Sequence, residues 1–117
     1  MSDQLVEAAV SAMKDIKAKN IVVMDLSQLD NAICKNFIIC HGTSNTHASS
    51  IAQAVEKELK DHLQEHAFRK EGYNNAEWIL LDYSSVVIHV FQEHIRDFYN
   101  IEELWGDAET TLIDSNL

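Results

Sequence analysis

One long amphipathic helix set between apolar strand-like runs limits the fold of this chain more than any other feature. Thr43, Ser44 and Asn45 are all good N-cap residues, so the helix is expected to begin there. It extends for roughly twenty residues, to about His66, which gives a length of about 30 Å. Its apolar positions keep helical spacing, and they are Ala48, Ile51, Ala52, Val55, Leu59 and Leu63. A helix of this length can cross a small sheet and cover it.

The segments on either side of this helix have the composition of β-strands. Residues 21–26 and 37–41 precede it, and both are rich in β-branched and other apolar side chains. Residues 77–82 and 86–91 follow it, and only Tyr83-Ser84-Ser85 separates them. The short connection predicts an antiparallel hairpin. A strand, a helix and another strand also predict a right-handed parallel crossover from residues 37–41 to residues 77–82.

Further helices are expected at both ends of this pattern. Residues 3 to about 18 carry an apolar stripe at helical spacing, and residues 93–99 and 101–105 read as short helical turns. The predicted element order is therefore αββαββα. It corresponds to the α/β class, with a mixed four-stranded sheet flanked by helices.

The chain is expected to form one domain over residues 1–106. It contains no proline and only three glycines, so no segment has the composition of an interdomain linker. Residues 68–75 are expected to form a loop. Residues 107–117 are expected to form an acidic, mobile tail.

The charge balance argues against recognition of a phosphate backbone. Nine Lys and Arg oppose nineteen Asp and Glu, giving a formal net charge of −10. Nucleic-acid binders normally present a basic face, and no such cluster is visible, so direct sequence-specific binding of nucleic acid is not expected. A basic protein partner suits this charge, although the charge also serves solubility alone.

The cysteines and the N-terminus favour the cytosol. Cys34 and Cys40 match no paired zinc spacing and lie in or beside apolar sequence, so reduced, buried thiols are expected. No apolar run approaches the length of a membrane span, and no membrane partner is expected. The first residues, MSDQLVEAAV, resemble neither a secretory signal nor a transit peptide.

Nucleotidyl transfer is the enzymatic alternative. Gly42-Thr43-Ser44 follows a strand and opens a helix, which is a place where a phosphate can bind. Such enzymes also need strand-borne carboxylates that hold two metal ions close together. Asp25 and Asp82 are single carboxylates at strand ends, while Asp107 and Glu109 have the right spacing but lie in the expected tail. The turn is therefore interpreted as a helix cap, and no enzyme activity is expected.

Two other kinds of chemical site find little support. His62 and His66 share one face of the long helix, but a zinc ion needs three or four ligands. Cys34 or Cys40 would need a histidine base, and neither cysteine has a local signature of a nucleophile. No metal, cofactor or catalytic residue is therefore predicted.

Large aromatic residues at the ends of elements offer a different role. Trp78 opens a strand, Tyr83 lies at the hairpin tip and Tyr99 ends a helical turn. Tryptophan and tyrosine dominate binding hot spots, yet they also fill cores, and the residues alone leave both roles open. Trp105, at a helix end, is expected to plug the core.

Three stretches of the chain carry a recognisable pattern, and they are Asn36 to Ser44 with His47 following, Trp78 to Phe91, and Arg96 to Trp105. In these stretches the chain resembles the ribosomal silencing factor (Iojap) family. The similarity runs from about Leu5 to Gly106, and the last two stretches are the most specific.

The resemblance implies a fold related to nucleotidyltransferases without their catalytic carboxylates. It also implies a function: such proteins bind the large ribosomal subunit at its protein uL-fourteen. They thereby block joining of the small subunit and lower translation when nutrients are scarce. A cytoplasmic, bacterial protein is expected, because organelle members would need a transit peptide.

Carried over by position, the partner-binding residues are Trp78, Asp82, Tyr83 and Tyr99. The resemblance leaves His89, Phe91, Leu104 and Trp105 to hold the hairpin and the last helix in place. The hairpin tip departs from the family pattern, which often has Gly-Asp where this chain has Ser84-Ser85, and Thr46 replaces a frequent arginine. A homodimer through an exposed strand edge or helix face is a further expectation.

Overall fold

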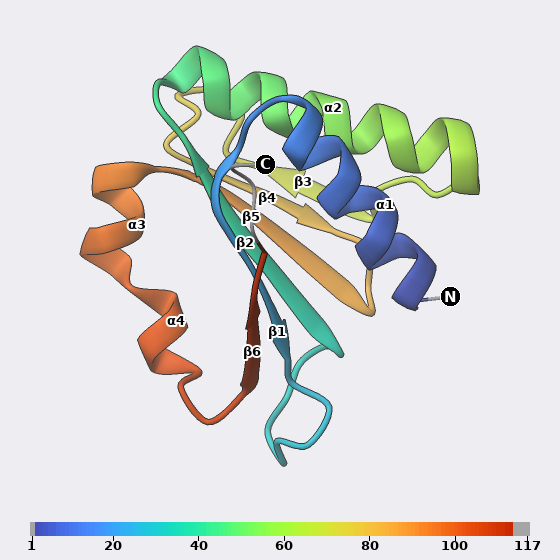
Figure 1. The fold of residues 1–117 in the computed structure, drawn as a ribbon, viewed down its shortest axis with the longest axis vertical. Helices are drawn as coiled ribbons and strands as arrows, with labels where there is room; N and C mark the ends of the chain where they lie inside the picture. Colours follow the sequence, from blue (N-terminus) through green and yellow to red (C-terminus); the bar gives the residue numbers. More distant parts are fainter. Residues whose placement is uncertain (1, 114–117) are drawn as a thin grey trace.

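The computed structural model describes residues 2–113 (Figure 1). These residues form four helices and six strands. In chain order the elements are α1 (Ser2–Asp15), β1 (Lys19–Asp25), β2 (Asn36–Gly42), α2 (Asn45–Leu63), β3 (Arg69–Glu71), β4 (Trp78–Asp82), β5 (Val86–Gln92), α3 (Glu93–Tyr99), α4 (Ile101–Leu104) and β6 (Glu109–Leu112). The predicted mixed α/β class is confirmed, but the predicted number of four strands is wrong.

One mixed sheet contains all six strands, in the order β3-β4-β5-β2-β1-β6. β2 and β5 pair in parallel, and the other neighbours pair antiparallel. The predicted hairpin is confirmed, since β4 pairs antiparallel with β5. The predicted parallel crossover to residues 77–82 is wrong, because the parallel neighbour of β2 is β5.

Strand β3 explains this error. It lies in the segment expected to be a loop, and it pairs antiparallel with β4 at the edge of the sheet. Its three residues, Arg-Lys-Glu, are all exposed, so they carry no apolar alternation that could reveal a strand. One additional strand after α2 adds one reversal of direction. The reversal makes β4 antiparallel to β2 and β5 parallel to it.

Strand β6 occupies the other edge of the sheet. Glu109–Leu112 were expected in a mobile tail, but they pair antiparallel with β1. All four side chains are exposed, so backbone hydrogen bonds rather than burial hold this strand, and no apolar alternation in its sequence predicts it. Residues 114–117 of the expected tail lie outside the described residues.

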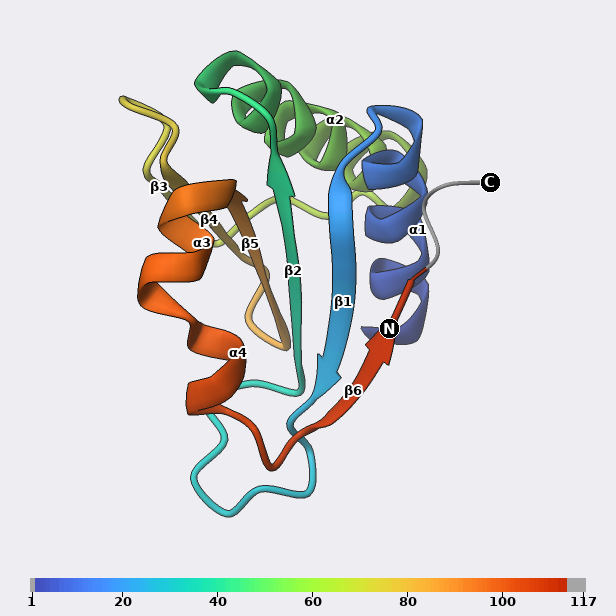
Figure 2. The ribbon, with the colours of Figure 1, turned by 60° about the vertical axis from the view of Figure 1, so that its left-hand side comes forward.

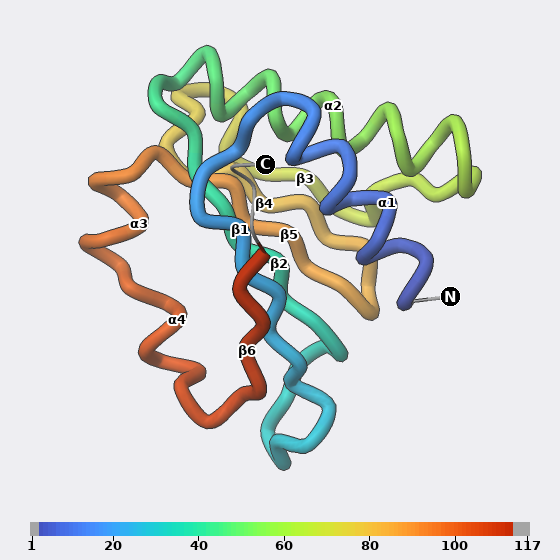
Figure 3. The backbone as a smooth tube through the Cα atoms, viewed as in Figure 1, coloured from blue at the N-terminus to red at the C-terminus, as the bar shows by residue number. Residues whose placement is uncertain are grey.

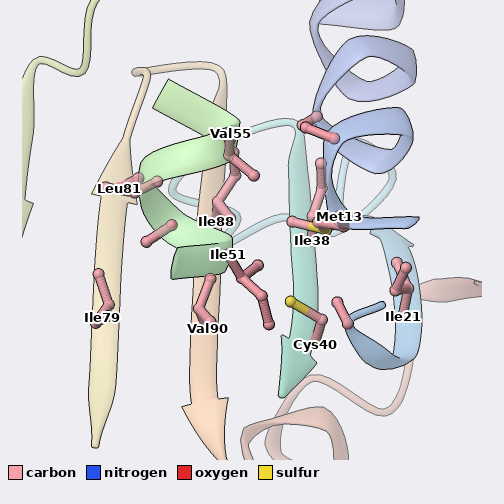
Figure 4. Close-up of a cluster of buried hydrophobic side chains, with 14 of the residues drawn as sticks. Met13, Ile21, Ile38, Cys40, Ile51, Val55, Ile79, Leu81, Ile88 and Val90 are labelled. Atoms are coloured by element: carbon pink, nitrogen blue, oxygen red, sulfur yellow. The ribbon is translucent and has the colours of Figure 1, made fainter. Parts of the chain in front are cut away.

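The sheet has an inner face covered by α1 and α2 and an outer face on which α3 and α4 lie (Figure 2). Met13 of α1, Ile51 of α2 and Ile38 of β2 meet in the inner core, which Figure 4 shows in close-up. The backbone trace in Figure 3 follows α3 and α4 from the end of β5 toward β6. Each of these two helices is short, so the outer layer is smaller than the inner one.

Helix α2 begins as its sequence predicts. The Ser44 hydroxyl accepts a hydrogen bond from the His47 backbone N–H at 3.0 Å and caps the helix. The helix ends with Gln64 in the left-handed conformation, with φ at 53°, slightly before the expected end. Five buried residues form its inner stripe, and they are Ala48, Ile51, Ala52, Val55 and Leu59. The apolar face read from the sequence is confirmed.

Strand β2 is the centre of the sheet and is buried along its whole length. Ile38 and Cys40 point to the inner core, while Phe37 and Ile39 belong to the outer core. This two-sided burial requires helices or loops on both faces of the sheet. The outer face above β4 is where that cover is incomplete.

Candidate functional site: the outer face of the hairpin

Alternation along the β4–β5 hairpin brings one set of side chains to the outer face. Trp78, Leu80 and Asp82 of β4 lie on this face, opposite Phe91, His89 and Val87 of β5 in that order. Directly opposed residues of an antiparallel pair are close enough for their side chains to touch. The hairpin therefore presents a continuous strip that is aromatic at one end and acidic at the other.

The aromatic end is a packed cluster centred on Trp78. Its ring lies 5.0 Å from the ring of Tyr99 and 4.9 Å from that of Phe91, measured between centroids. Trp78 is half-buried, whereas Tyr99 remains 53% exposed at the end of α3. The cluster thus fixes an exposed tyrosine against a tryptophan that is supported from below.

His89 supports Trp78 from the neighbouring strand. The indole N–H of Trp78 donates to Nδ1 of His89 at 3.1 Å, so Nδ1 must be unprotonated. Burial lowers the pKa of His89 to about 4, which keeps the ring neutral with its proton on Nε2. Nε2 is buried and meets no hydrogen-bond partner among residues 2–113. The ring of Phe37 packs against the imidazole with centroids 4.7 Å apart.

A hollow of about 350 Å³ opens beside this cluster, toward the hairpin tip. Phe37, Leu80 and Val87 form its apolar lining, and His89 contributes to it. Its rim holds two strongly exposed apolar side chains, Ile33 at 72% and Phe68 at 85%. Exposed apolar side chains gathered around a hollow are typical of a binding surface. The sequence did not predict the role of Ile33 and Phe68, because both lie in connecting segments without periodicity.

Asp82 provides the acidic end of the strip. One carboxylate oxygen accepts the Ser84 backbone N–H at 2.8 Å, and the other lies 3.9 Å from the Arg69 guanidinium. Ser84 has φ at 74°, a conformation that favours glycine, and the Asp82 contact compensates for part of that strain. The Asp82 carboxylate lies at the edge of the hollow, where it can meet a basic group of a partner.

Tyr83 does not join the other three predicted contact residues. It is 7% exposed and packs in the inner core, on the face of the sheet opposite Trp78. Burial raises the pKa of its phenol to about 12, and its hydroxyl meets no partner among the described residues. The structure therefore brings Trp78, Asp82 and Tyr99 to one face and places Tyr83 behind them, beneath the hairpin tip.

The residues expected to have a structural role behave differently from one another. Phe91 is fully buried, and Trp105 packs edge-on against Phe37 with ring centroids 5.8 Å apart. Leu104 is 76% exposed, so its expected role in holding the last helix is wrong. Phe98 is also exposed. Its ring packs edge-on against the Tyr99 ring, with centroids 5.0 Å apart, and it extends the apolar surface.

The turn at Gly42-Thr43-Ser44 is filled by groups of the chain itself. His47 Nδ1 accepts the Thr43 backbone N–H at 2.9 Å, while its Nε2 lies 2.7 Å from the Ile16 carbonyl oxygen. A Cβ at Gly42 would come within 2.8 Å of the Ala48 backbone nitrogen, so the glycine serves close packing of strand and helix. These contacts support the interpretation of the turn as a helix cap, and they also join α2 to the turn that follows α1.

The other groups considered as chemical sites lie apart from one another. His62 lies 2.9 Å from its helix neighbour Glu58. Burial raises the pKa of Cys34 to about 11 and that of Cys40 to about 12, so neither thiol is activated as a nucleophile. Within residues 2–113, no three His, Cys, Asp or Glu side chains gather in a way that could hold a metal ion. None of the helices in that span is both long and apolar enough to cross a bilayer.

These features define a class: a small α/β domain with one helix-covered face and one partly open aromatic face. A sequence model described as ribosomal silencing factor during starvation matches residues 1–116. The chain therefore belongs to the ribosomal silencing factor family.

Individual relatives agree with this assignment. The ribosomal silencing factor RsfS of Halalkalibacterium halodurans is 41% identical over 118 residues, covering 97% of each chain. RsfS of Bacillus subtilis is 34% identical over 113 residues, covering 94% of this chain and 92% of the relative. A crystal structure of a Chromobacterium violaceum protein superposes with a TM-score of 0.84 at 31% identity, covering 97% of this chain and 94% of the other. The fold is thus shared along nearly the whole chain.

Proposed function

We propose that this protein silences translation by binding the large ribosomal subunit through the outer face of its β4–β5 hairpin. The partner is ribosomal protein uL-fourteen, and the bound protein sterically blocks joining of the small subunit when nutrients are limiting. The mechanism needs occupancy alone and no covalent chemistry. It places the protein in the bacterial cytoplasm, where ribosomes are assembled and used.

The exposed Tyr99 ring packed at a tilt against Trp78 is the observation that carries this proposal. The pair lies beside an apolar hollow, and the surface is already organised before any partner arrives. Binding through rigid aromatic anchors loses little conformational entropy, because the rings are held in place beforehand. Family membership supports the ribosome as the target, since the relatives are named ribosomal silencing factors.

Charge supports the same partner. The net charge of −10 favours encounter with a basic ribosomal protein, and Asp82 lies at the edge of the proposed contact. Tyr83 is buried behind the hairpin tip, so we assign it a role in supporting the tip from within and not a contact with the partner.

Co-sedimentation with isolated bacterial large subunits tests the proposal. Tyr99→Ala and Trp78→Ala should each weaken binding by roughly thirtyfold, as expected when a hot-spot side chain is lost. Tyr99→Ala is the cleaner variant, since Tyr99 is half-exposed and Trp78 also packs on His89 and Phe91. Leu112→Ala is the control, because Leu112 is also an exposed apolar residue and lies on β6, at the edge of the sheet away from β4.

Two further measurements separate binding from silencing. The wild-type protein should lower the yield of joined ribosomes when both subunits are mixed, and Tyr99→Ala should not. A strain lacking the protein should also maintain a higher translation rate after transfer to poor medium. Failure of the wild-type protein to co-sediment with large subunits at low salt would refute the proposal.

A further inference from the structure

The α3–α4 corner carries Tyr99, yet it has little apolar burial of its own. The only buried residue of α3 is an arginine, Arg96, and α4 buries none of its residues. Ile95, Ile101 and Trp105 are half-buried against the outer core. Helices this short are not stable alone, so specific tertiary contacts must fix their position on the sheet.

Arg96 makes those contacts with all three of its side-chain nitrogens. Nε and one terminal nitrogen donate to the two carboxylate oxygens of Glu102, at 2.8 and 3.0 Å. The other terminal nitrogen donates to Nδ1 of His41 at 2.9 Å. This fork joins α3 to α4 and both helices to His41 near the end of β2, a geometry that lysine cannot reproduce.

The chain between Arg96 and Glu102 contains Tyr99 itself. Tyr99 is the last residue of α3, and Asn100 follows it in the left-handed conformation with φ at 46°. The Asn100 backbone N–H donates to the Arg96 carbonyl at 2.8 Å, which closes the turn. The guanidinium therefore connects the end of α3 to α4, and Tyr99 lies in the turn that this connection closes.

His41 adds a directional constraint to this corner. Arginine can only donate, so Nδ1 of His41 must accept and its proton must lie on Nε2. The side chain is 5% exposed, and α3 contributes Glu93 and Asp97 to the charges around it. A buried arginine with fixed partners on β2 and α4 can hold only one arrangement of the corner.

We propose that Arg96 is a positioning residue for the docking face: by tying Glu102 and His41 together, it sets the place of Tyr99 against Trp78. The expected effect of Arg96 on ribosome binding rests on the proposed function. The positioning itself is a property of the free protein and can be measured without ribosomes.

Arg96→Lys tests the proposal because it keeps the charge and removes the fork. In the free protein, the nuclear Overhauser contacts between the Trp78 and Tyr99 rings should be lost or weakened severalfold. Affinity for large subunits should fall by roughly tenfold, the usual effect of losing charge-assisted hydrogen bonds. Lys57→Gln is the matched control, since it breaks an exposed ion pair with Asp61 on α2, which covers the other face of the sheet.

Glu102→Gln is the second variant, and it decides the question if Arg96→Lys fails to fold. Its side chain is about one-third exposed, so the substitution disturbs burial less. It should weaken both the ring contacts and the binding, but by less than Arg96→Lys. Unchanged Trp78–Tyr99 contacts in both folded variants would overturn the positioning role. If the wild-type protein fails to bind ribosomes, the Trp78–Tyr99 ring contacts in the free protein still test the positioning role of Arg96.

Discussion

Lowering the pH from 7 to 5 should destabilise the fold through one buried histidine on the outer face. The pKa of His89 is about 4 in the folded protein, because burial disfavours the imidazolium, against an ordinary value of 6.5. Between these two values the unfolded chain binds a proton that the folded chain does not. The contribution of His89 to stability is therefore complete above about pH 6.5 and is lost as the pH falls toward 4.

The size of this effect follows from the two pKa values. The full difference of about 2.5 pKa units corresponds to roughly 3 kcal/mol, and the part that falls between pH 7 and pH 5 is about 2 kcal/mol. Carboxylates and the buried His41 also titrate, and burial lowers the pKa of His41 as well. A comparison with a variant that lacks only the His89 imidazole removes those shared contributions.

Urea unfolding at pH 7 and pH 5, followed by circular dichroism, measures the effect. His89→Phe keeps a ring of similar size among Phe37, Trp78 and Phe91, so it should lose about 2 kcal/mol less than the wild type between the two pH values. His66→Phe, at an exposed position, should keep the wild-type difference. An equal loss in wild type and His89→Phe would refute the neutral, buried state of His89.

Two further predictions concern backbone and thiols. Gly72→Ala should destabilise the fold by several kcal/mol in urea unfolding, because φ is 92° and a Cβ would lie 1.9 Å from the Trp78 carbonyl oxygen. Equal unfolding midpoints for the variant and the wild type would contradict this tight contact. A disulfide reagent at pH 8 should modify half-buried Cys34 first. Cys40 has no exposed surface, so it should react only at the rate of unfolding. Simultaneous modification of both thiols would contradict the burial of Cys40.

The inner half of the fold was predictable because burial leaves a period in the sequence. Val55 and Leu59 recur along α2 at helical spacing, and Ile79 and Leu81 alternate along β4, so both elements were placed correctly. The edge strands lack this signal. Arg69–Glu71 and Glu109–Leu112 are held by backbone hydrogen bonds, which every residue except proline can donate.

The residues proposed to contact the ribosome could be predicted from the sequence only in part. Period two places Trp78 and Asp82 of β4 on one face and Tyr83, the residue after the strand, on the other. It does not say which face helices cover, because that depends on where α1, α2 and α3 pack. The buried Tyr83 and the exposed Phe68 both follow from that packing and could not be read from composition.

The open outer face follows from the lengths of the helices on the two sides. On the inner face, the 19 residues of α2 reach across β2, β4 and β5, and α1 packs beside them. On the outer face, α3 and α4 contribute only 7 and 4 residues, and α3 contacts β5 and β2. Trp78 is covered in part by Tyr99, whereas Leu80 and Asp82 border the hollow. The same short corner that leaves this surface open also presents Tyr99 at its margin, so its position depends on Arg96 more than on apolar packing.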